Sequence, residues 1–201
     1  MSDQPISIEI PEGYTAIPLS DVVDNAEVLR DVGGNAARPH FGGLLPTIAT
    51  LLESLVANGT RYFGFGAHLL PDGLPLYSCL TISVTNSPGG PRNPRLVLSD
   101  LVRARSAENS LEQVALVETE SHPVMFSEKI GHVVPLRAGQ EQTTPAVYQL
   151  QAVVPSDDGT SLVAIELSSA DAERAVACRK MIADMARTVV FRTPEAFSLN
   201  L

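Results

Sequence analysis

The sequence is poor in several residue types that specialised binding sites use. It contains no tryptophan, two cysteines and 5% aromatic residues, and lysine occurs only as Lys129 and Lys180. The formal net charge is −9, and Lys and Arg form no run. Because phosphate backbones are bound by clustered cations, this composition argues against nucleic acid as a partner. The acidity is typical of a soluble protein or of one whose partner is basic.

The two cysteines do not predict a disulfide framework. Cys79 lies in a strand-like run, and Cys178 lies far away in a helical pattern. Two isolated cysteines in a chain of 201 residues are more typical of reduced, partly buried thiols than of a bridge. The chain is also long enough to bury a core without such a bridge.

The sequence shows neither a secretory leader nor a membrane span. Its first residues, MSDQPISIEIPEGY, have no basic region followed by an apolar segment. No apolar run is long enough to cross a bilayer. We therefore expect a cytoplasmic protein without membrane insertion. With 44% hydrophobic and 18% charged residues, the composition predicts a globular chain, and one domain over residues 1–201 is the simplest division.

The amino-terminal half predicts two short strands and then a helix. Residues 6–10 alternate isoleucine with polar residues, which indicates a strand that pairs through a turn at residues 11–13 with a return strand from Tyr14. A short helix near residues 19–29 is capped by Ser20. Residues 44–59 predict a helix, because apolar residues recur every three or four positions before Asn58 and Gly59 end it.

The middle of the chain predicts more strands and a helix. Residues 60–86 indicate two strands around the turn at Pro71, Asp72 and Gly73, with Gly64 and Gly66 suggesting a bulge or a close backbone approach. Residues 86–95, rich in proline and glycine, predict an exposed loop before a helix. Three further strands are expected in residues 110–121, 123–136 and 145–155.

The last segment has the clearest pattern. Residues 147–167 predict a hairpin whose turn, Ser156 to Gly159, needs a positive φ at the glycine. One long helix follows, with Ser168 and Asp171 at the spacing of a capping box. Its expected apolar stripe contains Ala172, Ala175, Val176, Cys178, Met181, Ile182, Ala183, Met185 and Ala186. Such a helix lies flat on a sheet, so the prediction is an α+β fold with helices covering a largely antiparallel sheet.

Several stretches, taken in order, resemble the Mog1/PsbP-like superfamily, in particular its small actinobacterial members. They are IEIPEGYTAIPL, LLPTIATLLESLVANG, CLTISVTN, YQLQAVVPSDDGTSLVAIELSS and ERAVACRKMIADMARTVVF, spanning residues 5–193. The resemblance implies an α/β/α sandwich around an antiparallel sheet. It also implies a binding function, since members include a small-GTPase-binding factor, a photosystem subunit, secretion-effector chaperones and envelope lipoproteins. No residue role carries over, and the lipobox cysteine of the lipoproteins is missing.

Isolated polar residues give only weak alternatives for a reactive site. His122 and His132, with glutamates nearby, allow a metal site, but surface histidines are the commoner case. Asp157 and Asp158 allow a carboxylate pair, but a hairpin tip is usually a solvated turn. Arg103 and Arg105 are expected on a solvated helix face. No nucleophile elbow, phosphate-binding loop or complete dinucleotide motif occurs.

The sequence therefore favours binding over catalysis, without a cofactor or metal. We expect a protein partner at two loops, where binding residues tend to collect. We also expect a non-catalytic adaptor or chaperone-like role linked to secretion or the envelope. A small-molecule binder or hydrolase with a site between sheet and loops is the alternative, and self-association through a sheet edge would make a homodimer. The candidate partner-binding residues are Arg38, His40, Phe41, Arg92 and Arg95.

Overall fold

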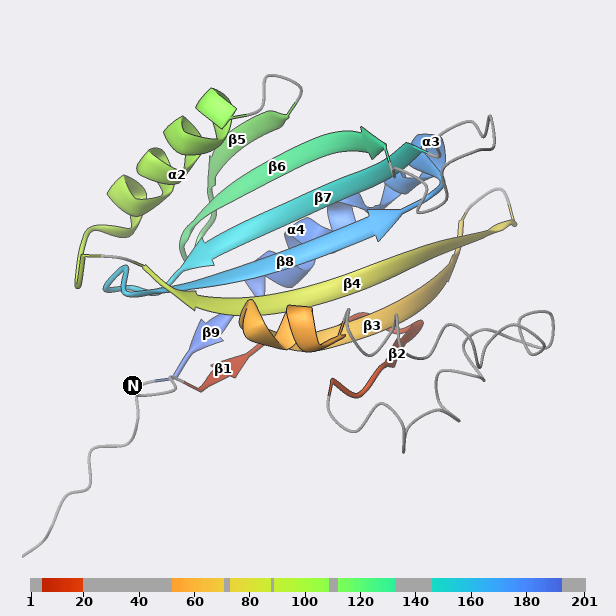
Figure 1. Ribbon diagram of the computed structural model, residues 1–201, viewed down its shortest axis with the longest axis horizontal. Helices are drawn as coiled ribbons and strands as arrows, with labels where there is room; N and C mark the ends of the chain where they lie inside the picture. The colour runs from red at the N-terminus through yellow and green to blue at the C-terminus, as the bar shows by residue number, and fades with distance from the viewer. Residues whose placement is uncertain are drawn as a thin grey trace, which may run out of the picture.

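The computed structural model describes residues 5–19, 52–70, 73–87, 89–108, 112–132 and 146–192. A seven-stranded sheet forms its centre, in the order β2-β3-β4-β8-β7-β6-β5, and each neighbouring pair is antiparallel (Figure 1). This confirms the antiparallel sheet. Its strands are β2 Tyr14–Ala16, β3 Thr60–Leu69, β4 Pro75–Asn86, β5 Gln113–Glu118, β6 Pro123–His132, β7 Ala146–Pro155 and β8 Ser161–Ser169.

Period-two alternation places one row of each central strand in the core. In β8, every second residue from Ser161 to Ser169 is buried, including Val163, Ile165 and Leu167. In β4, Leu80 and Ile82 are buried on the same face, as the sequence predicts. Since successive side chains point to opposite faces, each strand presents a second row to the other side of the sheet.

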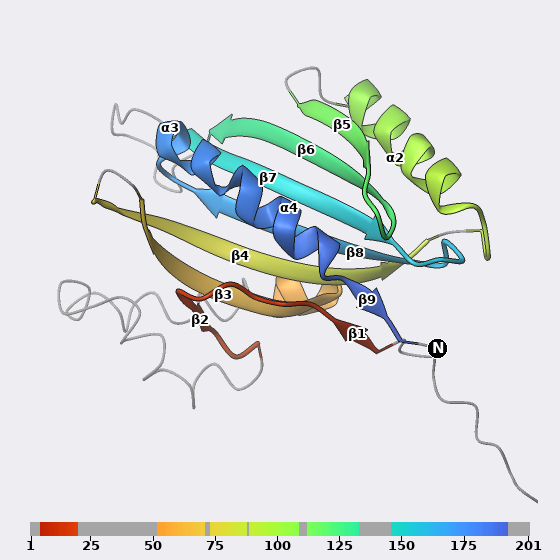
Figure 2. The same ribbon diagram turned by 180° about the vertical axis from the view of Figure 1, so that it is seen from behind.

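Helices cover both faces of the sheet, so the fold is α+β (Figures 1 and 2). On one face, helix α2, Pro94–Glu108, packs Leu98 against Met125 and Val153. Helical residues 52–57 lie on this face too, through Leu52 beside Phe63 and Phe65 of β3. The opposite face carries α3 Ala172–Ala175, the 3₁₀ turn η1 Val176–Cys178, and α4 Arg179–Arg187.

The closing helix rests on the sheet as expected, but it is not continuous. Ile182, Met185 and Ala186 are buried against β7 and β8. The helix is divided by η1, and this change of turn leaves the side chain of Val176 outside the buried stripe, 37% exposed. The expected cap is also corrected: Asp171 caps α3 by accepting a hydrogen bond from the N–H of Arg174.

The expected amino-terminal hairpin does not form. Strand β1, Ile6–Ser7, pairs with the last strand, β9 Val190–Phe191, whereas β2 pairs with β3. Ile6 and Phe191 both pack against the core beneath α4. The apolar side chains of this segment are therefore covered by long-range contacts, which a local turn at residues 11–13 would not provide.

Other local predictions are confirmed or corrected at the ends of elements. The helix at residues 52–57 ends at Asn58 and Gly59, where Gly59 has a φ of +80°. The predicted loop at residues 86–95 is shorter than expected, since α2 begins at Pro94. The predicted helix at residues 19–29 and the start of the predicted helix at 44–59 lie outside the described residues. Among the described residues, no helix has the length and hydropathy to cross a membrane.

Candidate functional site

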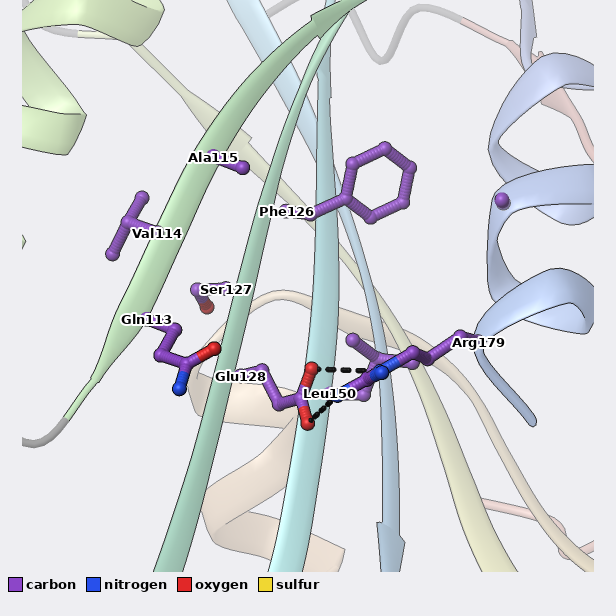
Figure 3. A pocket seen from close by; sticks show the side chains of 9 residues that line it. Gln113, Val114, Ala115, Phe126, Ser127, Glu128, Leu150 and Arg179 are labelled. Carbon is purple, nitrogen blue, oxygen red and sulfur yellow. Dashed lines mark hydrogen bonds and ion pairs between the residues drawn. The ribbon is translucent and has the colours of Figure 1, made fainter. Parts of the chain in front are cut away.

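An open groove lies between α4 and the edge strand β5, because α4 packs over β7 and β8, reaches β6 at Val124 and Phe126, and leaves this side of β5 exposed. A cavity of about 370 Å³ occupies one end of it (Figure 3). The cavity is walled by apolar side chains and has charged groups on one side. Its lining residues are Gln113, Val114, Ala115, Phe126, Ser127, Glu128, Leu150, Arg179 and Ala183.

A second cavity, of about 410 Å³, continues the groove toward the end of α4. It is lined by Val117, Glu118, Thr119, Glu120, Ser121 and Arg187. Arg179, Ala183 and Arg187 are four residues apart, so they share one face of α4. We call the two cavities together the α4–β5 groove.

The floor of the α4–β5 groove is partly apolar and open to solvent. Ala115 and Phe126 are directly paired across β5 and β6, and Figure 3 shows Phe126 on the side facing α4. Val117, on the same row of β5, is 42% exposed, and Ile130 farther along β6 is 54% exposed. Exposed apolar side chains that gather beside a cavity are a common feature of binding surfaces.

A two-point ion pair closes the polar side of the first cavity. The Nε of Arg179 donates to Oε2 of Glu128 at 2.9 Å, and the Nη2 donates to Oε1 (Figure 3). These hydrogen bonds raise the pKa of Arg179 above its usual value. The pair links α4 to β6 and places a guanidinium and a carboxylate next to the apolar wall.

The hydroxyl of Tyr148 lies beside this ion pair. Tyr148 on β7 is 1% exposed, and its hydroxyl interacts with both Arg179 and Glu128, although neither contact has the geometry of a well-aligned hydrogen bond. Burial raises the pKa of Tyr148 to about 12, and the negative charge of Glu128 adds to the shift. The hydroxyl therefore stays protonated at neutral pH and is suited to donating a hydrogen bond rather than to acting as a base.

Neither a metal-binding cluster nor an activated thiol occurs among the described residues. No group of three His, Cys, Asp or Glu residues in the described part of the chain is arranged to hold a metal ion. Both cysteines are free, and burial raises the pKa of the Cys79 and Cys178 thiols. Since the thiolate is the reactive form, neither thiol is activated as a nucleophile.

Two of the five sequence-predicted partner residues are already engaged within the chain. Arg92 pairs with Asp100 at 2.7 Å, and Arg95 makes a two-point pair with Glu118 at 2.8 and 3.0 Å. Arg95 belongs to the first turn of α2 rather than to a loop. Arg38, His40 and Phe41 lie outside the described residues, so their place relative to Arg92 and Arg95 stays a prediction.

Arg105 does not lie on a solvated helix face, in contrast to the sequence expectation. Its side chain is 27% exposed and reaches the sheet, where it contacts Glu112 at 2.8 Å and Ser127 at 2.9 Å. It also donates to Gln151, which in turn donates to Glu166 at 3.1 Å. Arg103, at 81% exposed, does lie on the solvated face. Arg105 differs from Arg103 in exposure because its side chain has polar partners on β6 and β7.

His122 and Asp158, two of the residues considered above for a reactive site, make structural contacts. The His122 ring contacts the carbonyl of Ala186 through Nε2 at 2.9 Å, and the side chain of His132 lies outside the described part. Asp158 accepts hydrogen bonds from Ser156 and from the N–H and hydroxyl of Thr160, at 2.7 to 3.0 Å. Asp158 therefore organises the turn between β7 and β8.

The two glycines of β3 are covered by aromatic rings. A Cβ at Gly64 would lie 2.4 Å from the hydroxyl oxygen of Tyr62, and one at Gly66 would lie 2.6 Å from a ring carbon of Tyr14. The close approach expected from sequence is therefore made by the protein's own side chains. The Tyr14 hydroxyl lies 3.0 Å from Oγ of Ser78, and burial raises the pKa of Tyr14 to about 12.

Sequence reasoning named Glu128 only as one of the glutamates near His122 and His132, and it did not single out Arg179 or Tyr148. One signal was present: Glu128 interrupts the alternating apolar row that contains Phe126 and Ile130. A charged residue in such a row indicates either an exposed position or a paired one. Its partner on α4 is 51 residues away, and no local pattern identifies it.

Comparisons with known proteins do not identify a family for this chain. No protein-family model matches the sequence, and no curated protein matches it. A crystal structure from Bacteroides thetaiotaomicron is similar, with 10% sequence identity and a TM-score of 0.49. The similarity covers 95% of this chain and 46% of the other, so this chain spans about half the length of that protein.

Proposed function

We propose that this chain is a non-catalytic protein-binding protein whose α4–β5 groove receives a segment of a partner. One observation carries the proposal: α4 leaves this side of β5 open, where Ala115 and Phe126 line a cavity of about 370 Å³ and Val117, 42% exposed, lines the next cavity along. Burying such side chains against a partner stabilises a complex by about 25 cal/mol per Å² of apolar area, before ordering costs.

The dimensions of the groove suit a short segment of chain. From Arg179 to Arg187 the helix face is about 12 Å long, at 1.5 Å per residue. An extended segment of about four residues spans that length. The first cavity has room for one anchoring apolar side chain, and a single anchor in a pocket often supplies much of the binding energy.

The sequence resemblance supports the same class of function. Members of the Mog1/PsbP-like superfamily act mostly as binding proteins, and we extend that role to this chain as an adaptor or chaperone-like protein. A cytoplasmic location and a link to secretion or the cell envelope belong to the same proposal. The net charge of −9 favours a partner with a basic surface outside the apolar contact.

Site-specific photocrosslinking in the native host tests the proposal. Benzoylphenylalanine in place of Ala183 is expected to trap the partner, whereas the same group at Leu69, which is 76% exposed on β3, is not. A crosslink to a second copy of this chain is recognised by its mass and is counted separately.

Binding of the purified partner provides the decisive measurement. Ala183→Arg fills the first cavity and is expected to weaken binding at least about tenfold, because it replaces an apolar contact with a charge. Leu69→Arg is the matched control and should bind as the wild type does. Equal trapping at both positions, or a partner that binds Ala183→Arg normally, would show that the groove is not the site.

Small-molecule binding in the first cavity is a second candidate function. It is favoured by the Arg179–Glu128 pair on one side of an apolar cavity, since a few polar groups in an apolar pocket are typical of ligand sites. A fragment screen followed by NMR would detect it. Fragments that shift residues around Phe126 in the wild type and not in Ala183→Arg would support it, and the absence of such fragments would argue for the protein partner alone.

A further inference from the structure

Among the described residues, no strand pairs with the outer edge of β5. β5 ends the sheet, and Figure 1 shows it as the outermost strand on that side. Five of its six residues are exposed, including Leu116 and Val117 at 42% each. It contains no proline and no basic residue, and its register with β6 is continuous from Gln113 to Glu118. The opposite edge strand, β2, is only three residues long.

Natural proteins protect sheet edges with short strands, charged residues, proline or bulges, because an open edge pairs with another chain. β2 is protected because it is short. β5 carries a charged residue only at its end, Glu118, and Arg95 already neutralises that carboxylate. We propose that β5 is the pairing edge of a homodimer, in which two copies of β5 add to each other antiparallel about a two-fold axis through Ala115.

The sequence of β5 suits this register. A two-fold axis perpendicular to the sheet keeps each face on its own side, so it pairs residues of the same row. With Ala115 on the axis, Val114 of one copy lies opposite Leu116 of the other, and Gln113 lies opposite Val117. Apolar side chains then meet on the α2 side, and the small Ala115 side chain lies at the centre, where the two strands approach.

The charges at the strand ends are compatible with this pairing. The same register brings Glu118 of one copy near Glu112 of the other. Each carboxylate is held by an arginine of its own α2 helix: Arg95 binds Glu118 at 2.8 Å, and Arg105 binds Glu112 at 2.8 Å. Like charges directly opposite would oppose pairing, but here each charge is balanced before the copies meet. A second copy is therefore favoured over an unrelated strand, since Val114 and Leu116 of the two copies meet in one apolar row and each end carboxylate already has its own arginine.

Dimer formation would also add to the α4–β5 groove. Gln113 lines the first cavity, and in this register Val117 of the second copy lies directly beside it. The second copy thus extends the apolar floor past the edge of the sheet. The dimer does not depend on the proposed partner, because it uses the outer edge of β5 rather than the cavity between β5 and α4.

Sedimentation velocity over a range of protein concentrations tests the dimer. We expect the wild-type chain to reach twice the monomer mass, and Leu116→Lys to weaken association at least about tenfold, because lysine on an edge strand opposes pairing. Leu116 is exposed in the single chain, so this variant should fold normally, which circular dichroism verifies. Leu69→Lys, also at an exposed leucine, is the control and should dimerise as the wild type does.

Crosslinking checks the register. Cysteine replacing Ala115 is expected to join two copies through a short bis-maleimide, whereas cysteine replacing Leu69 is not, and the wild-type chain accounts for the native thiols. A monomer at every concentration overturns the proposal. So does a dimer that Leu116→Lys leaves intact and that Ala115→Cys does not crosslink. Either result leaves the Ala183 partner test unaffected, so the two proposals fail separately.

Discussion

Arg179 on α4 and Glu128 on β6 form a two-point ion pair at the start of the α4–β5 groove, although they are 51 residues apart in sequence. The pair joins the helix layer to the strand next to the sheet edge. The adjacent Tyr148 hydroxyl is buried and interacts with both charged groups without a well-aligned hydrogen bond. The groove therefore combines an apolar floor with a polar end.

The Arg179–Glu128 pair should contribute little to folding stability. The Arg179 side chain is 53% exposed, so solvent screens the attraction. A double-mutant cycle with Arg179→Gln and Glu128→Gln is expected to give a coupling energy of about 0.5 kcal/mol in urea unfolding, decreasing in high salt. A coupling of several kcal/mol that does not respond to salt would contradict this expectation.

Removing the Tyr148 hydroxyl should not destabilise the protein. Tyr148→Phe gives up only the poorly aligned contacts of the hydroxyl with Arg179 and Glu128 and removes a buried polar atom, so the free energy of unfolding is expected to stay nearly equal. Tyr14→Phe is the matched comparison, because it breaks the 3.0 Å contact with Ser78 and should cost about 1 kcal/mol. If Tyr148→Phe costs more than Tyr14→Phe in urea unfolding, Arg179 or Glu128 holds the Tyr148 hydroxyl more firmly than its geometry indicates.

The turn between β7 and β8 should make stability depend on pH. Hydrogen bonds from the N–H of Thr160, and from the hydroxyls of Ser156 and Thr160, lower the pKa of Asp158 below its ordinary value of 3.8. Because the folded-state pKa is the lower one, the contribution of Asp158 is complete above pH 3.8 and is lost as pH falls through the folded-state pKa.

Asp158→Asn tests this pH dependence. Unfolding in urea should show a deficit of about 1 kcal/mol at pH 7 relative to the wild type, and the deficit should shrink in strong acid. Asp157→Asn, on the neighbouring exposed residue, is the control and should change little. A deficit for Asp158→Asn that is the same at both pH values would count against the carboxylate as its source.

Gly159 should tolerate substitution less well than Gly73. Both have positive φ, +68° and +77°, but a Cβ at Gly159 would lie 2.3 Å from the carbonyl oxygen of Arg92, whereas a Cβ at Gly73 meets nothing within 4 Å. We expect Gly159→Ala to cost about 3 kcal/mol and Gly73→Ala about 1 kcal/mol. Thermal or urea unfolding of both variants measures the difference, and equal losses would mean that the turn moves away from Arg92 freely.

The sequence alone determined the local elements of this protein. Alternating apolar residues defined the buried row of β4 and β8, and Gly159 marked the turn that needs a positive φ. The apolar spacing in the last segment also placed a helix on the sheet. These properties could be predicted because periods of two and 3.6 residues, and the steric freedom of glycine, act within a few residues of chain.

Only the tertiary structure decided which distant segments meet. It paired β1 with β9 instead of β2, interrupted the last helix at η1, and drew Arg105 from solvent onto the sheet. It also left the groove between α4 and β5 and joined Arg179 to Glu128 across it. These outcomes depend on how layers fit together in space, where side chains from separate elements compete for the same apolar and polar partners, and no local period encodes that competition.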